Sequence, residues 1–188
     1  MKHIAPQIEL PLGEKDDVWY NHSAVSSMES GRLRATYLND QPRYIISRYT
    51  IYTDGSAWPN PGGPAGWCAI VMLNGQRVGK PVLGRETQST NNRAEINAAI
   101  AGLRKTPKGA SVTVITDSQY LQNGANKWCH CWVKNDFRKA KNADLWRKLW
   151  VLIQERDCVF QWVRGHNGDA LNEEADRLAE KERLAVKL

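Results

Sequence analysis

The chain has 188 residues, of which 41% are hydrophobic, 24% are charged and eight are tryptophan. This length suits one domain of ordinary size with an appendage, and this apolar content excludes a chain that is disordered throughout. The 26 Lys and Arg against 20 Asp and Glu give a net charge of +6, which makes an anionic partner worth testing without identifying one.

The first part of the chain, residues 1–47, holds proline and glycine at irregular intervals and shows no sustained periodicity. We predict an irregular N-terminal extension of unknown role there, with no more than one short element. The first strand is predicted at 44–53, because this segment is rich in β-branched and aromatic residues. It stops at Asp54-Gly55, a pair typical of a strand that reaches a turn.

A hairpin is predicted next. Two apolar runs, 67–73 and 77–83, are joined by Asn74-Gly75, which is a strong signal for a two-residue hairpin turn. The first three strands should therefore be antiparallel.

The rest of the chain alternates between helical and strand patterns. The segments are a helix at 94–103, a strand at 112–116, a helical region at 118–153 interrupted around 135–142, a fifth strand at 158–163 and a final helix around 171–179. This order predicts an α/β fold with a five-stranded mixed sheet and helices on both faces.

A basic stretch lies within the long helical region. Residues 127–148 contain seven Lys and Arg and two acids, a local charge of +5, with tryptophans and a phenylalanine interleaved. Such a mixture suits a groove that binds nucleic acid. It equally suits a solvated helix whose tryptophans, four residues apart, form its core stripe.

Four acids fall at or near element boundaries: Asp54, Glu95, Asp117 and Asp176. Each has an ordinary explanation, since Asp54 suits a turn, Glu95 a capping box with Asn92, and Asp176 an ion pair along a charged helix. Gathered together, however, four carboxylates would repel one another unless a divalent cation bound them. Two such ions can clamp both oxygens of a phosphodiester displacement.

Competing chemistries have weaker support. Cys129-His130-Cys131 is the one zinc candidate, and it lacks a companion pair. Neither a Gly-x-Ser-x-Gly elbow nor a Gly-x-x-x-x-Gly-Lys loop is present. The four cysteines are too few for a disulfide scaffold, and no run approaches the ~18 apolar residues of a membrane span. We therefore predict metal-dependent phosphodiester chemistry in a cytoplasmic protein with no membrane partner.

Five ordered motifs resemble those of type I ribonuclease H over about residues 48–182. They are Thr53-Asp54-Gly55-Ser56 with Asn60-Pro61-Gly62, Thr90-Asn91-Asn92-Arg93-Ala94-Glu95, Thr116-Asp117-Ser118-Gln119-Tyr120, Trp162-Val163-Arg164-Gly165-His166 and Asn172-Glu173-Glu174-Ala175-Asp176. The resemblance implies a ribonuclease H-like fold and a catalytic domain at 48–188. It also implies an endonuclease that cuts the RNA strand of RNA/DNA hybrids with Mg²⁺ or Mn²⁺, leaving 5′-phosphate and 3′-hydroxyl ends.

The resemblance assigns the acids as ligands of two metal ions. Asp54 would bridge both ions, Glu95 and Asp117 would hold the ion at the leaving oxygen, and Asp176 would help hold the ion that activates water. His166, in a loop with Gly165 and Gly168, would assist proton transfer or product release.

The resemblance also implies substrate contacts. Asn60, Asn91 and Gln119 would touch the RNA strand, Trp128 and Trp132 would pack on DNA sugars, and Thr90 would hold a DNA phosphate. Lys134, Arg138 and Lys139 remain from a basic protrusion that is a few residues shorter here. The amides equally suit turn and cap chemistry.

Two other functions fit the same pattern: a binding module without turnover, and a nuclease, integrase or resolvase that acts on DNA. The intact acids disfavour the first, and the Asn-Pro-Gly, Thr-Asn-Asn and Gly-His-Asn segments disfavour the second. We expect a monomer that binds an RNA/DNA hybrid.

Overall fold

The computed structural model describes residues 33–38, 41–46 and 48–187. The chain divides into two compact units, Met1–Ser47 and Arg48–Leu188. In the first unit, β1 (Leu33–Leu38) pairs antiparallel with β2 (Gln41–Ile46). The prediction of no more than one short element in this unit was wrong, because β1 and β2 are two paired strands. The rest of the predicted irregular extension lies on residues 1–32, outside the described part of the chain.

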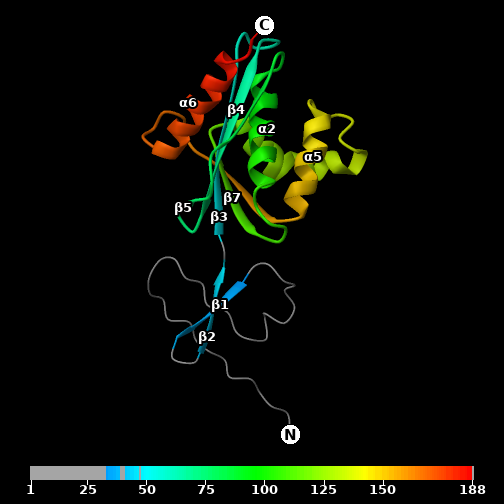
Figure 1. Cartoon of the computed structure of the whole chain (residues 1–188). Coiled ribbons are helices and arrows are strands. Elements are labelled where there is room, and N and C mark those ends of the chain that lie inside the picture. The colour runs from blue at the N-terminus through cyan, green and yellow to red at the C-terminus, as the bar shows by residue number, and fades with distance from the viewer. Residues whose placement is uncertain (1–32, 39–40, 47, 188) are drawn as a thin grey trace. The chain divides into compact units, whose positions relative to one another are not determined.

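The second unit is built on a mixed sheet (Figure 1). Its strands are β3 (Arg48–Ala57), β4 (Ala65–Leu73), β5 (Gln76–Arg77), β6 (Val82–Glu86), β7 (Ser111–Thr116) and β8 (Asp157–Trp162). The order is β5-β4-β3-β7-β8, with β6 also paired to β4. Strand β4 pairs antiparallel with β3, β5 and β6. The β3–β7 and β7–β8 pairs are parallel, so the sheet is mixed, as predicted.

The sheet has six strands where five were predicted. The Asn74-Gly75 turn is confirmed, with both residues at positive φ, but the strand predicted at 77–83 is split into β5 and β6. Gly79 adopts a φ of +70° between them, and Pro81 has no N–H to give to the ladder.

The strand predicted at 44–53 was also wrong in its bounds, because β2 takes its first residues and β3 begins at Arg48.

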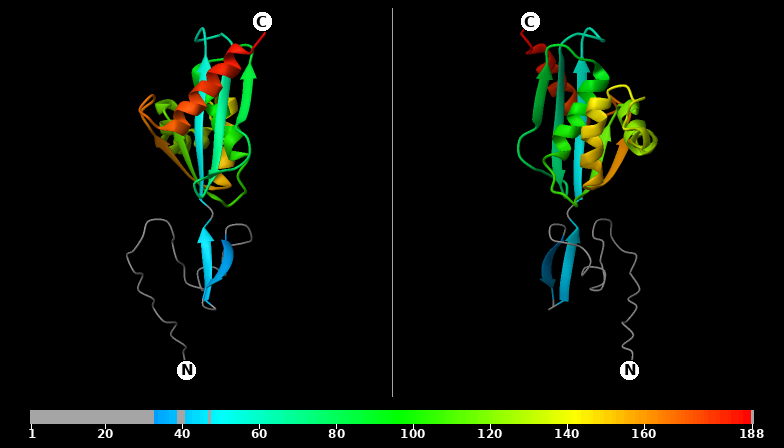
Figure 2. Two further views of the ribbon diagram at one scale, coloured as in Figure 1. Left: turned by 60° about the vertical axis from the view of Figure 1, so that its left-hand side comes forward. Right: turned by 90° about the vertical axis from the view of Figure 1, so that its right-hand side faces the viewer.

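Helices cover both faces of the sheet (Figure 2). The helical elements are α2 (Asn91–Leu103), α3 (Gln119–Asn123), a π-helical turn at Gly124–Trp128, α4 (Cys129–Trp132), a 3₁₀ turn at Val133–Asn135, α5 (Ala143–Gln154) and α6 (Ala170–Leu184). Helices α2 and α5 lie on one face and α6 lies on the other (Figures 1 and 2). The predicted interruption around 135–142 is confirmed, and Asp136 and Phe137 turn the chain there with positive φ.

Two apolar clusters fill the space between the layers. The larger one joins the sheet to α2 and α5 around Ile51, Val114 and Trp146, all fully buried. The smaller one joins β4 to α6 through Cys68, Ile70 and helical alanines. All four cysteines are free thiols, as expected. None of the helices between 48 and 187 has the length and apolar character needed to cross a membrane.

Candidate active site

Two of the predicted acids follow the last rung between adjacent parallel strands. Thr53 of β3 pairs with Thr116 of β7, and Asp54 and Asp117 are the next residues of each chain segment. Because parallel neighbours carry their strand ends to the same edge, Asp54 and Asp117 lie close together there, as the expectation of neighbouring strands required. Asp54 does not end its strand, however, because β3 continues to Ala57 and Asp54 pairs with Cys68.

Gly55 explains why Asp54-Gly55 is not the predicted turn. The glycine lies in β3 opposite Trp67, in extended pairing with β4. A Cβ atom at Gly55 would overlap the backbone of Ala94 and Glu95 in α2. The glycine therefore serves close packing of a helix on a strand, which brings Glu95 to the level of Asp54.

Replacing Gly55 by alanine should destabilise the protein by about 1–3 kcal/mol, because the methyl group must push α2 away from β3. Urea unfolding measures this loss. The matched control is Gly79→Ala, whose added methyl meets no atom within 4 Å but whose φ of +70° strains the backbone. A loss at Gly55 no larger than that at Gly79 would contradict the packing role.

Glu95 is not the partner of a capping box. The structure places the cap at Thr90, whose side chain accepts a hydrogen bond from the Arg93 N–H, so the predicted pairing of Asn92 with Glu95 was wrong. Helix α2 begins earlier than its apolar spacing indicated, and Glu95 lies beyond its first turn. Its carboxylate is buried, and its Oε2 atom has no hydrogen-bond partner.

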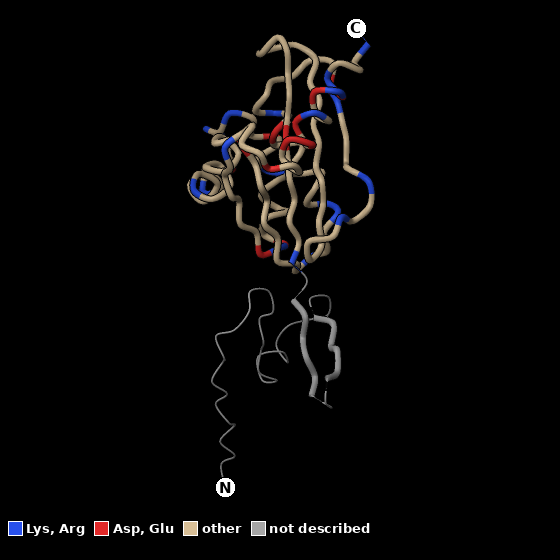
Figure 3. The backbone as a smooth tube through the Cα atoms, turned by 90° about the vertical axis from the view of Figure 1, so that its left-hand side faces the viewer, with Lys and Arg blue, Asp and Glu red and all other residues tan. Residues whose placement is uncertain are grey.

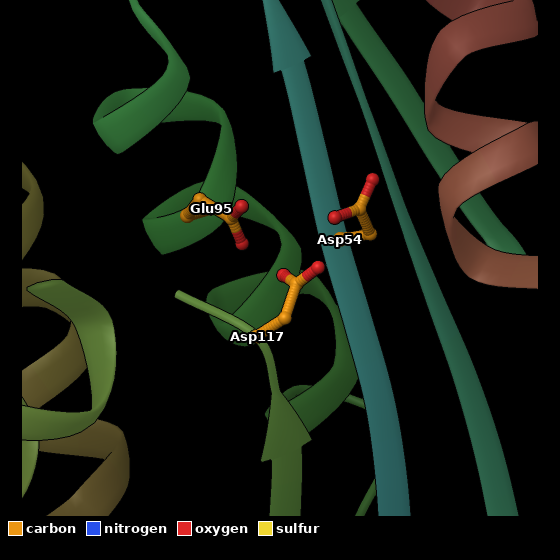
Figure 4. A group of neighbouring side chains, drawn as sticks. All are labelled: Asp54, Glu95 and Asp117. Carbon is orange, nitrogen blue, oxygen red and sulfur yellow. The ribbon is translucent and has the colours of Figure 1, made fainter. Parts of the chain in front are cut away.

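The carboxylates of Asp54, Glu95 and Asp117 converge on one point (Figure 4). Each offers an oxygen that lies within 4.8 Å of those of the other two. Between residues 48 and 187 this is the one group of three or more side chains with metal-binding geometry, and Cys129-His130-Cys131 does not form another. Clustered carboxylate oxygens with an unpartnered buried acceptor fit a hard divalent cation such as Mg²⁺.

Burial and mutual repulsion make these acids hard to ionise without a cation. Burial, followed by the charges of Asp117 and Asp176, raises the pKa of Asp54 to about 7. The pKa of Glu95 is raised well above its usual value, first by burial and then by Asp54. Burial is also the main cause of the raised pKa of Asp117. A bound cation would lower these pKa values again, because its positive charge would offset both the burial of the carboxylates and their mutual repulsion.

Two residues beside Asp117 have supporting contacts that the motif pattern did not explain. The Trp162 indole N–H donates to the backbone oxygen of Asp117 at 2.8 Å. A Cβ atom at Gly165 would lie 2.7 Å from Asp117 Oδ2, so the glycine leaves room for the carboxylate. Both residues stand in one of the motifs, but only the tertiary contacts show what they do.

Asp176 lies on α6, outside the group of three. Its charge raises the pKa of Asp54, Glu95 and Asp117, which places it within electrostatic range of all three. His166 Nδ1 lies 3.7 Å from Asp176 Oδ2, and the His166 side chain is 80% exposed. The loop that carries it turns with positive φ at His166 and Gly168. Figure 3 shows several acidic positions close together in this unit, with basic positions around them.

The predicted substrate amides are tied to the start of α2. Asn91 Oδ1 accepts from the Ala57 N–H at 2.6 Å, and Asn60 Oδ1 accepts from the Asn91 N–H at 3.3 Å. The turn and cap explanation is therefore correct for their oxygens. Among the described residues the Nδ2 groups of both side chains make no hydrogen bond, and both residues are exposed. Gln119, the first residue of α3, is exposed too.

The tryptophans of the basic stretch divide between the two predicted roles, a buried core stripe and an exposed aromatic surface. Trp146 is fully buried in the core, whereas Trp128 is 39% exposed. Trp132 connects them, with ring centroids 5.6 Å from Trp128 and 5.4 Å from Trp146. The row of tryptophan rings therefore runs from the buried core at Trp146 to the protein surface at Trp128. The side chains of Lys134, Arg138 and Lys139 beyond it are exposed, and within the described chain none of these three forms an ion pair.

Comparisons with known proteins identify the family of this chain. The RNase H family model matches residues 47–183. A ribonuclease H of Rickettsia canadensis is 45% identical over 139 residues, which cover 71% of this chain and 88% of the relative. One of Francisella tularensis subsp. novicida is 44% identical over 140 residues, covering 72% and 90%.

A similar solved structure is LC9-RNase H1, described as a type 1 RNase H with the type 2 active-site motif. It matches with a TM-score of 0.65 at 28% identity, covering 73% of this chain and 72% of that one. The family model spans most of the chain, and the relatives are matched over nearly their whole length. This chain therefore belongs to the ribonuclease H family of endoribonucleases.

Proposed function

We propose that residues 48–188 form a catalytic domain that hydrolyses the RNA strand of RNA/DNA hybrids and leaves 5′-phosphate and 3′-hydroxyl ends. The observation that carries this proposal is the convergence of Asp54, Glu95 and Asp117 within 4.8 Å, with one buried carboxylate oxygen unpartnered. Such a group needs divalent cations, and we assign it Mg²⁺, for which Mn²⁺ can substitute. The role of residues 1–47 stays open.

In the proposed two-ion mechanism the four acids act as ligands of different ions. Asp54 would help to hold both ions, Glu95 and Asp117 would help to hold the ion at the leaving oxygen, and Asp176 would help to hold the ion that activates water. When bound, the two ions would stabilise the charge on the attacking and leaving oxygens of an in-line displacement. Gly55 and Gly165 support this geometry by letting α2 and the 163–169 loop approach the acids.

His166 supports the reaction without holding a metal. Its imidazole is exposed and lies 3.7 Å from Asp176, so it is open to both solvent and the group that Asp176 would help to hold. We assign it to proton transfer or to release of the cleaved product.

Recognition of the hybrid follows from groups on both sides of the acids. The free Nδ2 groups of Asn60 and Asn91, with Gln119, can contact 2′-hydroxyls of the RNA strand. Trp128 and Trp132 would pack on DNA sugars, and Thr90 would hold a DNA phosphate. Lys134, Arg138 and Lys139 would contact further phosphates. We expect a monomer that acts in the cytoplasm, where its thiols stay reduced.

A substrate panel tests this proposal. With Mg²⁺, the purified protein should cleave RNA in a labelled hybrid and leave duplex DNA and duplex RNA largely intact, because only the hybrid offers 2′-hydroxyls on one strand alone. EDTA should abolish cleavage. Equal cleavage of duplex DNA would favour the DNA nuclease class instead, and full activity in EDTA would rule out the metal mechanism.

A further inference from the structure

The loop between β3 and β4 exposes a tryptophan four residues after Asp54. Trp58 directly follows the end of β3 and is 69% exposed, whereas Trp146 of the same unit is fully buried. An indole is the largest apolar side chain, and leaving most of it in water forgoes the stabilisation that burial would give. Single exposed apolar residues are common on protein surfaces, so exposure alone assigns no role.

The loop is held in one conformation by its own backbone. The Trp58 N–H donates to Pro64 O at 3.1 Å, and the Gly63 N–H donates to Pro59 O at 2.8 Å. The Ser89 N–H donates to Gly63 O at 2.8 Å, which ties the loop to the segment before α2. An exposed indole on a fixed backbone loses little entropy when it contacts a ligand, which distinguishes it from a side chain on a mobile tip.

The loop that carries Trp58 also carries an amide that the proposed function assigns to the RNA strand. The same loop carries Asn60, which bonds to Asn91 at the start of α2. Trp58 follows Asp54 by four residues, so their Cα atoms are at most about 14 Å apart. At about 3.4 Å per nucleotide of one strand, this upper limit between the two Cα atoms corresponds to roughly four nucleotides.

The chemistry of the side chain selects sugars as its target. Trp58 carries no charge, so it cannot form an ion pair with phosphate. The bases inside a duplex are stacked on one another, so the indole cannot stack on them. A hybrid instead presents ribose rings along a wide and shallow minor groove. Trp128 and Trp132, proposed to pack on the DNA sugars, lie on a different element from the loop.

We propose that Trp58 is a further substrate-binding residue that packs its indole against ribose rings of the RNA strand next to the cleavage point. This inference rests on the proposed function, since it assumes that an RNA/DNA hybrid is the substrate. Trp58 acts in binding and takes no part in the chemical step.

Binding measurements test the contact directly. In an Asp54→Asn background that does not cleave, fluorescence anisotropy with a labelled hybrid in Mg²⁺ should show about tenfold weaker binding for Trp58→Ala. Trp58→Phe keeps a flat ring and should bind within about twofold of the parent. Leu184→Ala removes an equally exposed apolar side chain, at 68%, from the far end of α6 and should leave binding unchanged.

Salt dependence separates this contact from the phosphate contacts. An apolar contact releases no counterions, so Trp58→Ala should weaken binding equally at all salt concentrations, whereas Lys139→Ala should lower the slope of log K against log salt by about one. With Asp54 intact, Trp58→Ala should raise KM about tenfold and leave kcat unchanged.

Three results would overturn the inference: unchanged affinity and KM in Trp58→Ala, a loss confined to kcat, or equal weakening by Leu184→Ala. A failure of the proposed function would look different: the protein without substitutions would then show no preference for the hybrid over duplex DNA and duplex RNA.

Discussion

Replacing Asp54 by asparagine is expected to abolish RNA cleavage while preserving binding of the hybrid. Asp54 is the acid assigned to both metal positions, and Glu95 and Asp117 each already supply an oxygen of their own to the same group. Neutral asparagine offers one weaker oxygen and no charge, so the loss in the single-turnover rate should be about a thousandfold or more. Binding depends on the amides, tryptophans and basic residues, so the affinity should stay within a few-fold.

A matched control uses an acid of the same type on the same sheet. Asp157 begins β8 and is exposed, and Asp157→Asn should cleave hybrid at the rate of the unsubstituted protein. Rates are measured with labelled hybrid in Mg²⁺ at enzyme excess, and affinity by anisotropy. Cleavage by Asp54→Asn within tenfold of the original rate would remove Asp54 from the centre of the mechanism.

The second large expected effect concerns protein stability: ionisation of Asp54 should destabilise the folded state, whereas ionised acids in ion pairs usually stabilise it. Because the folded-state pKa of Asp54 is raised to about 7 from 3.8, the native state binds more protons than the unfolded state between these values. The contribution of Asp54 to the free energy of unfolding of the metal-free protein should therefore be most favourable at low pH and should fall as pH rises from 4 to 7. For Asp54 alone the cost above pH 7 is on the order of 4 kcal/mol.

Asp54→Asn should consequently stabilise the metal-free protein at pH 8, because the substitution removes a buried charge and its repulsion of Asp117 and Glu95. At pH 5 the difference from the original protein should be smaller. Adding Mg²⁺ at pH 8 should stabilise the original protein more than the variant, since the ion binds the ionised carboxylates of the folded state.

Urea unfolding in EDTA at pH 5 and pH 8, followed by the same series in Mg²⁺, measures all three effects. Asp157→Asn again serves as the control and should show no comparable gain at pH 8. A stability difference between the variant and the original protein that is the same at pH 5 and pH 8 in EDTA, or a variant less stable than the original protein at pH 8 in EDTA, would show that burial of Asp54 carries no such cost.

The sequence pattern predicted the elements well where a local signal was strong. The Asn74-Gly75 hairpin and the helices of 94–103 and 118–153 rest on turn chemistry and 3.6-residue spacing, which depend on nearby residues. It failed at Asp54-Gly55, where a turn signal lies inside β3. The competing cause is distant in sequence, since Gly55 is required by the backbone of Ala94 and Glu95.

The sequence alone determined the family motifs, the mixed sheet and the identity of the four acids, because each depends on residue type and order. Only the tertiary structure decided that Asp54, Glu95 and Asp117 meet within 4.8 Å, that Asp176 lies outside this group and 3.7 Å from His166, and that Trp58 is exposed. These facts depend on how strands pair and how closely α2 approaches β3. Such contacts join residues tens of positions apart, and no local pattern encodes their distance or burial.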